Sequence, residues 1–188
     1  MAWFDLDDKE FSELLRLSRL YHREAIRCED SKAYLAGCAM AGASLEALLL
    51  AMVHMYGDEV EAAGFVAKTG KNQAKELRRW TLSELLQTAA GMHWLPAAIQ
   101  TQEKWSGRRA KIGDYAKELM KTRNLIHPGR YLRDHSPSRV TQKYLTGSIE
   151  VLDAAHEQLQ AKVHESLARK MAEMDHTSEE TTGNKDAS

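Results

Sequence analysis

Arg123 and His127, an arginine and a histidine four residues apart, are the pair in this sequence best suited to chemistry. Helical apolar periodicity stops at Ile126, and Pro128 followed by Gly129 does not continue a helix, so the pair is predicted to occupy a last helical turn. At this spacing both side chains project from one helix face. A guanidinium can stabilise negative charge and an imidazole can move a proton, which together suit a reaction at a phosphodiester. The alternative interpretation is that both side chains only complement the helix dipole.

Basic residues are concentrated around this pair, although the whole chain has a formal net charge of -1. Residues 104–143 hold eleven basic residues against three acidic ones, and residues 68–79 hold five against one. Such a distribution favours a polyanionic partner, because contacts with phosphates supply most non-specific affinity for nucleic acid. A solvated helix face is the simpler explanation of a basic run. The residues expected to bind RNA are Lys121, Arg130, Arg133, Arg108 and Arg109.

Glu46 is the only Asp, Glu, Lys or Arg between residues 33 and 56. Its helical neighbours are small or apolar, so the carboxylate is predicted to face the protein interior. An unpaired buried charge is costly, and Arg123 is the expected partner. This ion pair can support a catalytic site, or it can be a purely structural link between two core helices.

Helical periodicity runs through the whole chain, and no segment shows the alternation typical of a sheet. The predicted fold is therefore all-α, an antiparallel helical bundle with a long C-terminal helix. Residues 1–174 are expected to form a single domain, and the polar, acidic residues 175–188 a disordered tail. The expected main helices begin near Asp7, Ala33, Thr81, Arg108 and Ser136, with a short one at Pro96.

Two of these helix starts have the spacing of a capping box, Asp7 with Glu10 and Thr81 with Glu84. The helix that carries the Arg–His pair is expected to bury one apolar stripe, with Arg123 beside it, where a site can be partly exposed. The residues of that stripe are Ile112, Tyr115, Leu119 and Ile126.

The apolar segment 33–56 is long enough to span a membrane, but Glu46 and Ser44 interrupt it, and its many small residues suit close helix contact. A central helix of a soluble bundle is therefore expected, with no membrane contact. The acidic start of the chain lacks a secretory signal, and Cys28 and Cys38 form no CxxC motif, so a cytoplasmic protein with reduced thiols is expected. No ligand-type residues have metal-site spacing, so neither a metal nor a cofactor is expected.

An all-α bundle with Arg123, Asn124 and His127 at the end of a main helix resembles the HEPN superfamily (higher eukaryote and prokaryote nucleotide-binding domains). The sequence Ala-Ser-Leu-Glu-Ala-Leu-Leu, which contains Glu46, is also similar to that group. Family members usually place more residues between the Arg and the His than the three found here, and this shorter spacing would rotate the His relative to the Arg. Some branches carry a Tyr shortly after the His, and here Tyr131 is the nearest.

The resemblance implies a metal-independent endoribonuclease of the kind found in toxin–antitoxin and phage-defence systems. Such a protein acts on RNA as a homodimer and can be held by an antitoxin or another partner protein. The resemblance assigns Arg123 to the scissile phosphate, His127 to proton transfer and Asn124 to orientation, with Glu46 and Tyr131 in support. Other members of the superfamily lack activity. The alternative is therefore a non-catalytic HEPN-like helical module that binds a partner protein or a nucleotide.

Overall fold

The structure, a computed structural model, describes residues 3–95 and 140–183, and between them residues 120, 123–124, 126–127, 129 and 132–133. Within these ranges the chain is helical, which confirms the all-α prediction. The one β-type pairing there is an isolated bridge between Lys68 and Ala74. The helices are α1 (Asp8–Asp30), α2 (Tyr34–Met55), α3 (Gly57–Ala62), the 3-10 helix η1 (Leu77–Arg79), α4 (Leu82–Gly91) and α7 (Gln142–Gly183).

Both predicted capping boxes are present. The Asp7 side chain accepts a hydrogen bond from the Glu10 N–H at 2.7 Å, and the Asp7 N–H donates to the Glu10 carboxylate at 3.0 Å. At the start of α4 the Thr81 N–H donates to Glu84 Oε2 at 2.6 Å, and the Thr81 hydroxyl accepts from the Glu84 N–H at 3.4 Å. Each box satisfies N–H groups that the first helical turn leaves without partners, and such a cap is worth about 1 kcal/mol.

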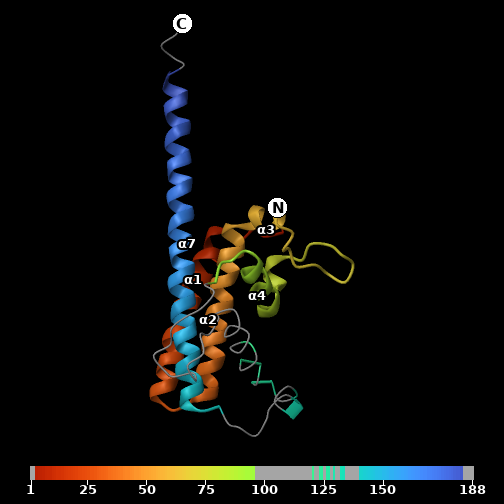
Figure 1. The fold of residues 1–188 in the computed structure, drawn as a ribbon, viewed down its shortest axis with the longest axis vertical. Coiled ribbons are helices and arrows are strands. Elements are labelled where there is room, and N and C mark those ends of the chain that lie inside the picture. The colour runs from red at the N-terminus through yellow and green to blue at the C-terminus, as the bar shows by residue number, and fades with distance from the viewer. Residues whose placement is uncertain are drawn as a thin grey trace.

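Helix α2 is the central element, with α1, α4 and α7 packed around it (Figure 1). Ser18 of α1 meets Ser44, and Cys28 lies against Gly37, so α1 and α2 run antiparallel. Helix α7 runs parallel to α2, since Leu145 near its start packs on Gly37 and the Lys162 carbonyl further along accepts a hydrogen bond from Tyr56. The long connection after α4 lets α7 begin at the end where α2 begins.

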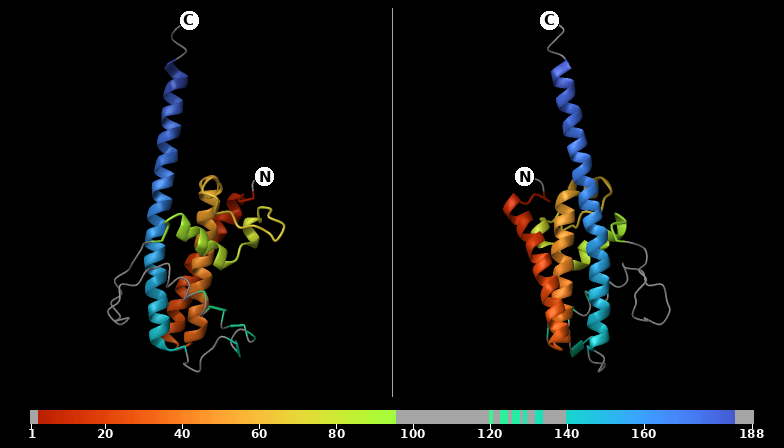
Figure 2. Two further views of the ribbon diagram at one scale, coloured as in Figure 1. Left: turned by 45° about the vertical axis from the view of Figure 1, so that its right-hand side comes forward. Right: turned by 90° about the vertical axis from the view of Figure 1, so that its left-hand side faces the viewer.

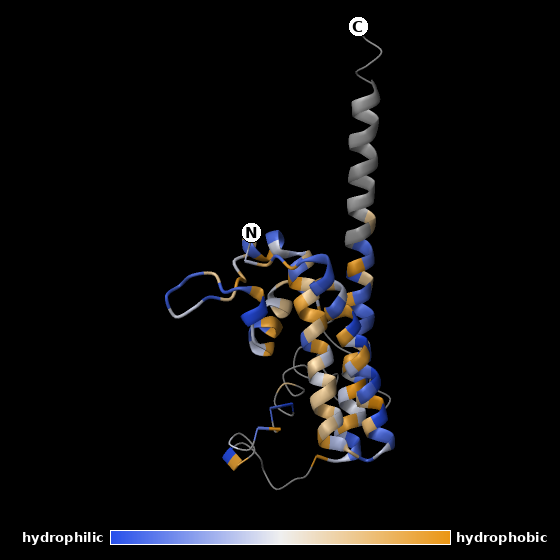
Figure 3. Ribbon diagram, turned by 180° about the vertical axis from the view of Figure 1, so that it is seen from behind, coloured by the Kyte–Doolittle hydropathy of each residue, from blue (hydrophilic) through white to orange (hydrophobic). Residues whose placement is uncertain are grey.

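The core is centred on α2, thirteen of whose residues are buried. Figure 3 shows α2 as hydrophobic along its length, whereas α1 alternates between polar and apolar residues. Among the residues described, Tyr34–Met55 is the one helix long and apolar enough to cross a membrane, with a mean hydropathy of 1.7. Because 72% of that window is buried within the protein, the apolar surface of α2 is used to pack its neighbouring helices.

The small residues of α2 determine how closely the three long helices approach one another. A Cβ atom at Gly37 would lie 2.5 Å from a methyl group of Leu145 and 3.0 Å from the Cβ of Cys28. A larger residue would push α1 and α7 away from α2, because interhelical distance follows the side chains at the contact. Glycine at position 37 therefore allows the end of α1 and the beginning of α7 to pack closely on the beginning of α2.

Helix α7 continues well beyond the other helices (Figure 1 and Figure 2). It extends through Gly183, so residues 175–183, which the sequence places in a disordered tail, are helical, while residues 184–188 lie outside the described ranges. Extending an existing helix requires no new nucleus, so a polar composition does not by itself end it. The predicted helix starts at Pro96 and Ser136 also lie outside the described ranges.

Candidate functional site

The Arg–His segment leaves the α-helix earlier than its sequence predicts. Arg123 and Asn124 are helical, but Ile126 lies in a turn and His127 in a bend. The Ile126 N–H donates to the Arg123 carbonyl at 3.4 Å, and the His127 N–H donates to the Asn124 carbonyl at 3.1 Å. Both hydrogen bonds span three residues, as in the tighter 3-10 turn that often ends a helix. The α-helical spacing therefore does not continue to His127, which corrects the prediction that both side chains share one face of an α-helical turn.

The same early ending explains a second difference. Ile126, predicted to lie on the buried stripe of this helix, is 47% exposed. The predicted stripe assumes α-helical periodicity beyond Asn124, where that periodicity no longer applies. Met120, one turn before Arg123, is partly buried against the core. Among the described residues of the segment, Met120, Arg123 and Asn124 are partly buried, whereas Ile126 and His127 are exposed.

Glu46 and Arg123 form the ion pair that the sequence predicts. The Arg123 Nη2 atom lies 2.6 Å from Glu46 Oε2, and the two side chains are 29% and 21% exposed. Glu46 lies on the one stripe of α2 that is not fully buried, together with Ala43 and Leu50. Because the other sides of α2 are covered, this stripe is where the Arg–His segment reaches the central helix.

The electrostatics of this pair reflect its partial burial. Desolvation raises the pKa of the Glu46 carboxyl, and the positive charge of Arg123 opposes that rise. Removing the arginine would leave the Glu46 carboxylate on an apolar helix without a positive charge to balance it. The contact joins Nη2 of Arg123 to Glu46 Oε2, and a single carboxylate can accept at most two of the five N–H donors of a guanidinium. A guanidinium held in this way can still donate to a phosphate.

His127 is exposed, and Asn124, three residues earlier in the chain, is half-buried. An exposed imidazole can reach a substrate without any change in the core. Of the residues expected to bind RNA, Arg133 is exposed and follows Leu132, which is 84% exposed. The positions of the other predicted site residues lie outside the described ranges: Lys121, Arg130, Arg108, Arg109 and Tyr131.

A polar cluster that the sequence does not predict lies inside the bundle. The His156 Nε2 atom of α7 is 3.0 Å from the Ser18 hydroxyl of α1 and 3.1 Å from the Ser44 hydroxyl of α2. Each hydroxyl also donates to the other serine's carbonyl, at 3.1 and 2.7 Å. A hydroxyl has a single proton, so in this arrangement the neutral imidazole is the donor at Nε2. His156 continues the buried pattern of Leu152 and Ala155, which was the available sequence signal.

This serine–histidine contact is not a hydrolase site. Ser44 is 0% exposed and Ser18 is 1% exposed, so neither hydroxyl can reach a substrate. The cluster instead connects three helices through hydrogen bonds that need all three in register. His22 and Asp153 extend it toward the surface, with His22 Nε2 2.7 Å from Asp153 Oδ1.

The buried histidine predicts that folding stability depends on pH. Desolvation, with the nearby His22 as a smaller cause, lowers the pKa of His156 to about 4. In the unfolded chain an imidazole has a pKa of about 6.5 and takes up a proton first, so stability falls as the pH falls through this window. From about pH 7 to about pH 4.5 we expect a loss of roughly 2–3 kcal/mol due to this residue.

Urea denaturation at both pH values measures this loss. His156→Gln should remove most of it, while His164→Gln, which changes an exposed histidine of the same helix, should keep it. Equal pH dependence in the wild type and in both variants would refute this role of His156.

Within the described part of the chain, no group of three or more His, Cys, Asp or Glu residues is arranged to hold a metal ion. Compared with family models, with curated proteins and with solved structures, the chain matches none. The contacts of the site itself, between Glu46 and Arg123 and between Asn124 and His127, therefore carry the functional inference.

Proposed function

We propose that the chain is a metal-independent endoribonuclease of HEPN type. The observation that carries this proposal is the placement of the Arg–His segment. Its arginine is anchored to the central helix by Glu46 at 2.6 Å, while its histidine is exposed. A partly buried, oriented guanidinium and, four residues later in the chain, an exposed imidazole supply a phosphate-binding group and a proton-transfer group, as phosphodiester cleavage requires.

In the proposed reaction the ribose 2′-hydroxyl attacks the adjacent phosphorus, and the bond from phosphorus to the 5′ oxygen breaks. His127 removes the proton of the 2′-hydroxyl or donates one to the departing 5′ oxygen. Arg123 binds the phosphate and stabilises the additional charge of the pentacovalent transition state, and Asn124 orients the phosphate or the imidazole through its amide. Because the attacking group comes from the RNA itself, the products are a 2′,3′-cyclic phosphate and a 5′-hydroxyl.

A second copy of the chain would supply the second proton-transfer group. One imidazole cannot be deprotonated as base and protonated as acid at the same moment, so two His127 side chains across a homodimer would divide these roles. Light scattering at micromolar protein concentration tests the dimer, and a monomer under conditions where RNA is cleaved would refute this part of the proposal.

The cleavage assay combines purified protein, a single-stranded RNA and a chelator, with DNA of the same sequence as the control. We expect the RNA to be cut to fragments ending in 2′,3′-cyclic phosphate and the DNA to remain intact, because DNA lacks the 2′-hydroxyl. Cleavage of both nucleic acids, or products that end in a 3′-hydroxyl, would overturn the mechanism.

A non-catalytic module that binds a partner protein or a nucleotide is the second candidate. The observation in its favour is that Glu46 already balances the charge of Arg123, as expected for a purely structural ion pair. Absence of RNA cleavage by a folded sample in the same assay would favour this candidate.

A further inference from the structure

A basic arm, residues 64–76, projects from the bundle between α3 and η1 (Figure 1). Its backbone is ordered by hydrogen bonds: the Thr69 N–H donates to the Gln73 carbonyl and the Lys75 N–H donates to the Ala67 carbonyl, both at 2.9 Å. Asn72 at the tip has a φ of 62°, a left-handed conformation that asparagine tolerates better than most residues. The arm is therefore a closed turn with a defined tip.

The charges of the arm and its base are divided into paired and unpaired cations. Lys75 donates to both oxygens of Glu84 at 2.9 Å, and Arg78 of the adjoining η1 donates to Glu10 at 2.8 and 2.5 Å. These ion pairs fix the base of the arm to α4 and α1. The cations left exposed, for which the described part of the chain provides no ion-pair partner, are Lys68, Lys71 and Arg79.

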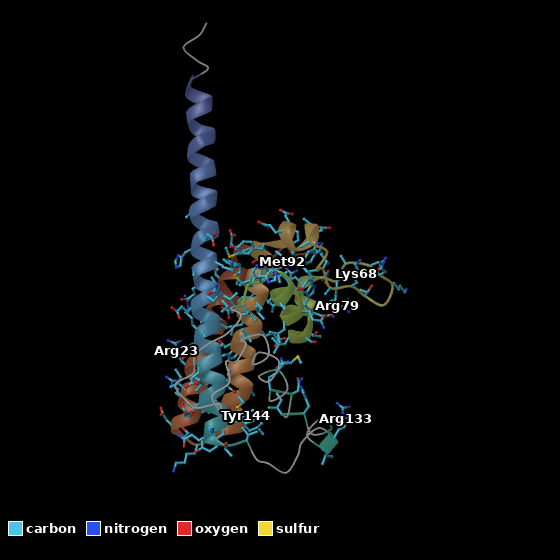
Figure 4. All side chains as sticks on the ribbon, viewed as in Figure 1. Arg23, Lys68, Arg79, Met92, Arg133 and Tyr144 are labelled. Atoms are coloured by element: carbon cyan, nitrogen blue, oxygen red, sulfur yellow. The ribbon has the colours of Figure 1, made fainter. Side chains whose placement is uncertain are left out.

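No acidic residue lies close to Lys68 or Lys71 along the chain, because residues 62–75 contain neither Asp nor Glu, whereas Glu76 lies at the base of the arm, three residues before Arg79. In Figure 4, Lys68, Arg79 and Arg133 project from the same side of the bundle, whereas Arg23 of α1 lies on the opposite side. The arm and its base thus place positive charges on the same side of the molecule as Arg133.

We propose that the basic arm binds the sugar–phosphate backbone of single-stranded nucleic acid, through Lys68, Lys71 and Arg79, away from the site of cleavage. The inference rests on the proposed function for the identity of the strand as RNA. Ammonium groups act as point charges toward phosphates and do not read base edges, so this contact is independent of sequence. Phe65, at the base of the arm, packs its ring over Gly91, and residues 67–75 beyond it contain no aromatic or large aliphatic side chain to insert into a lipid surface.

The test is binding of a fluorescent single-stranded DNA, measured by anisotropy over a series of salt concentrations. DNA has the same backbone charge but lacks the 2′-hydroxyl, so binding is separated from cleavage. The arm variant is Lys68→Gln with Lys71→Gln. The matched control is Arg19→Gln with Arg23→Gln, which removes two exposed charges from α1. We expect about tenfold weaker binding by the arm variant at low salt, and a salt slope smaller by about 1 to 1.5.

Arm-dependent binding with an unaffected control supports the proposal, provided that thermal melts show all three proteins folded. Binding unchanged in the arm variant, or weakened equally in the control, overturns it even if the wild type cleaves RNA. Arm-dependent binding without any RNA cleavage overturns the ribonuclease and retains the arm as a nucleic-acid contact. Binding to vesicles that contain phosphatidylserine, with none to DNA, overturns the arm proposal in favour of a membrane surface.

Discussion

The change of His127 to alanine is expected to slow RNA cleavage by about 10²–10⁴-fold, the usual contribution of a general acid or base. The fold should be retained, because His127 is exposed and the hydrogen bond from its backbone N–H to the Asn124 carbonyl does not involve the imidazole. The measurement is the rate of cleavage of a labelled RNA in the presence of chelator, together with a thermal melt of each protein.

His164→Ala is the matched control, since His164 is also an exposed histidine but belongs to α7. It should cleave RNA at the wild-type rate. Equal cleavage by the wild type and both variants would identify a contaminating nuclease and remove the support for a catalytic His127. A loss of activity accompanied by a lower melting temperature in His127→Ala would show that the residue acts through the fold.

The second large effect concerns the ion pair. Arg123→Ala is expected to lower the free energy of unfolding by about 1–3 kcal/mol, because Glu46 then remains in an apolar setting with the charge that balanced it gone. Both side chains are less than a third exposed, so water replaces the lost partner only in part. Urea denaturation near neutral pH measures the change.

A surface ion pair of the same chemistry provides the control. Arg27 lies 2.5 Å from Glu24 within α1, and the two side chains are 73% and 36% exposed. Arg27→Ala should change the free energy of unfolding by at most about 0.5 kcal/mol, since solvent screens exposed pairs. If Arg123→Ala cost no more than Arg27→Ala, the Glu46 contact would not be an important link between the segment and α2.

The pH dependence of the Arg123→Ala effect identifies its cause. Burial raises the pKa of Glu46 in the folded protein above its value in the unfolded chain. The stability that Glu46 contributes is therefore fully present at a pH below the unfolded-state pKa, and it is lost as the pH rises through the folded-state pKa. Without the opposing charge of Arg123 this loss becomes larger. The penalty of Arg123→Ala should therefore grow as the pH rises above the pKa of a glutamate in the unfolded chain, about 4.3, and Glu46→Gln in the same background should abolish that growth. A penalty independent of pH would contradict this explanation.

Features encoded within a few residues could be predicted from the sequence alone. The capping boxes at Asp7 and Thr81 are present because a side chain and an N–H three residues apart are enough to form them. The Glu46–Arg123 pair could also be predicted, although its partners are far apart in the chain. A single carboxylate on an otherwise apolar helix requires a cation, and Arg123, beside the apolar stripe of another predicted helix, is placed to supply it.

The apolar periodicity of the sequence does not predict side-chain burial correctly where a helix ends. The exposure of Ile126 and the three-residue hydrogen bond of His127 depend on the turn that closes the helix, and an apolar pattern does not specify that turn. The same limit applies at the other end of the chain. A polar composition predicted disorder from residue 175, yet α7 continues to Gly183 because propagation of a helix is less costly than its nucleation.

The all-α class, the helix starts set by caps and the need of Glu46 for a cation can be inferred from local sequence patterns. The parallel course of α7 and α2, and the contacts of His156 with Ser18 and Ser44, become apparent only in the packed fold. Each of those three residues alone fits an ordinary helix. Their hydrogen bonds exist only once three helices, of which α7 follows α2 after a long stretch of chain, pack in a single register. That register results from close contacts summed over the whole core.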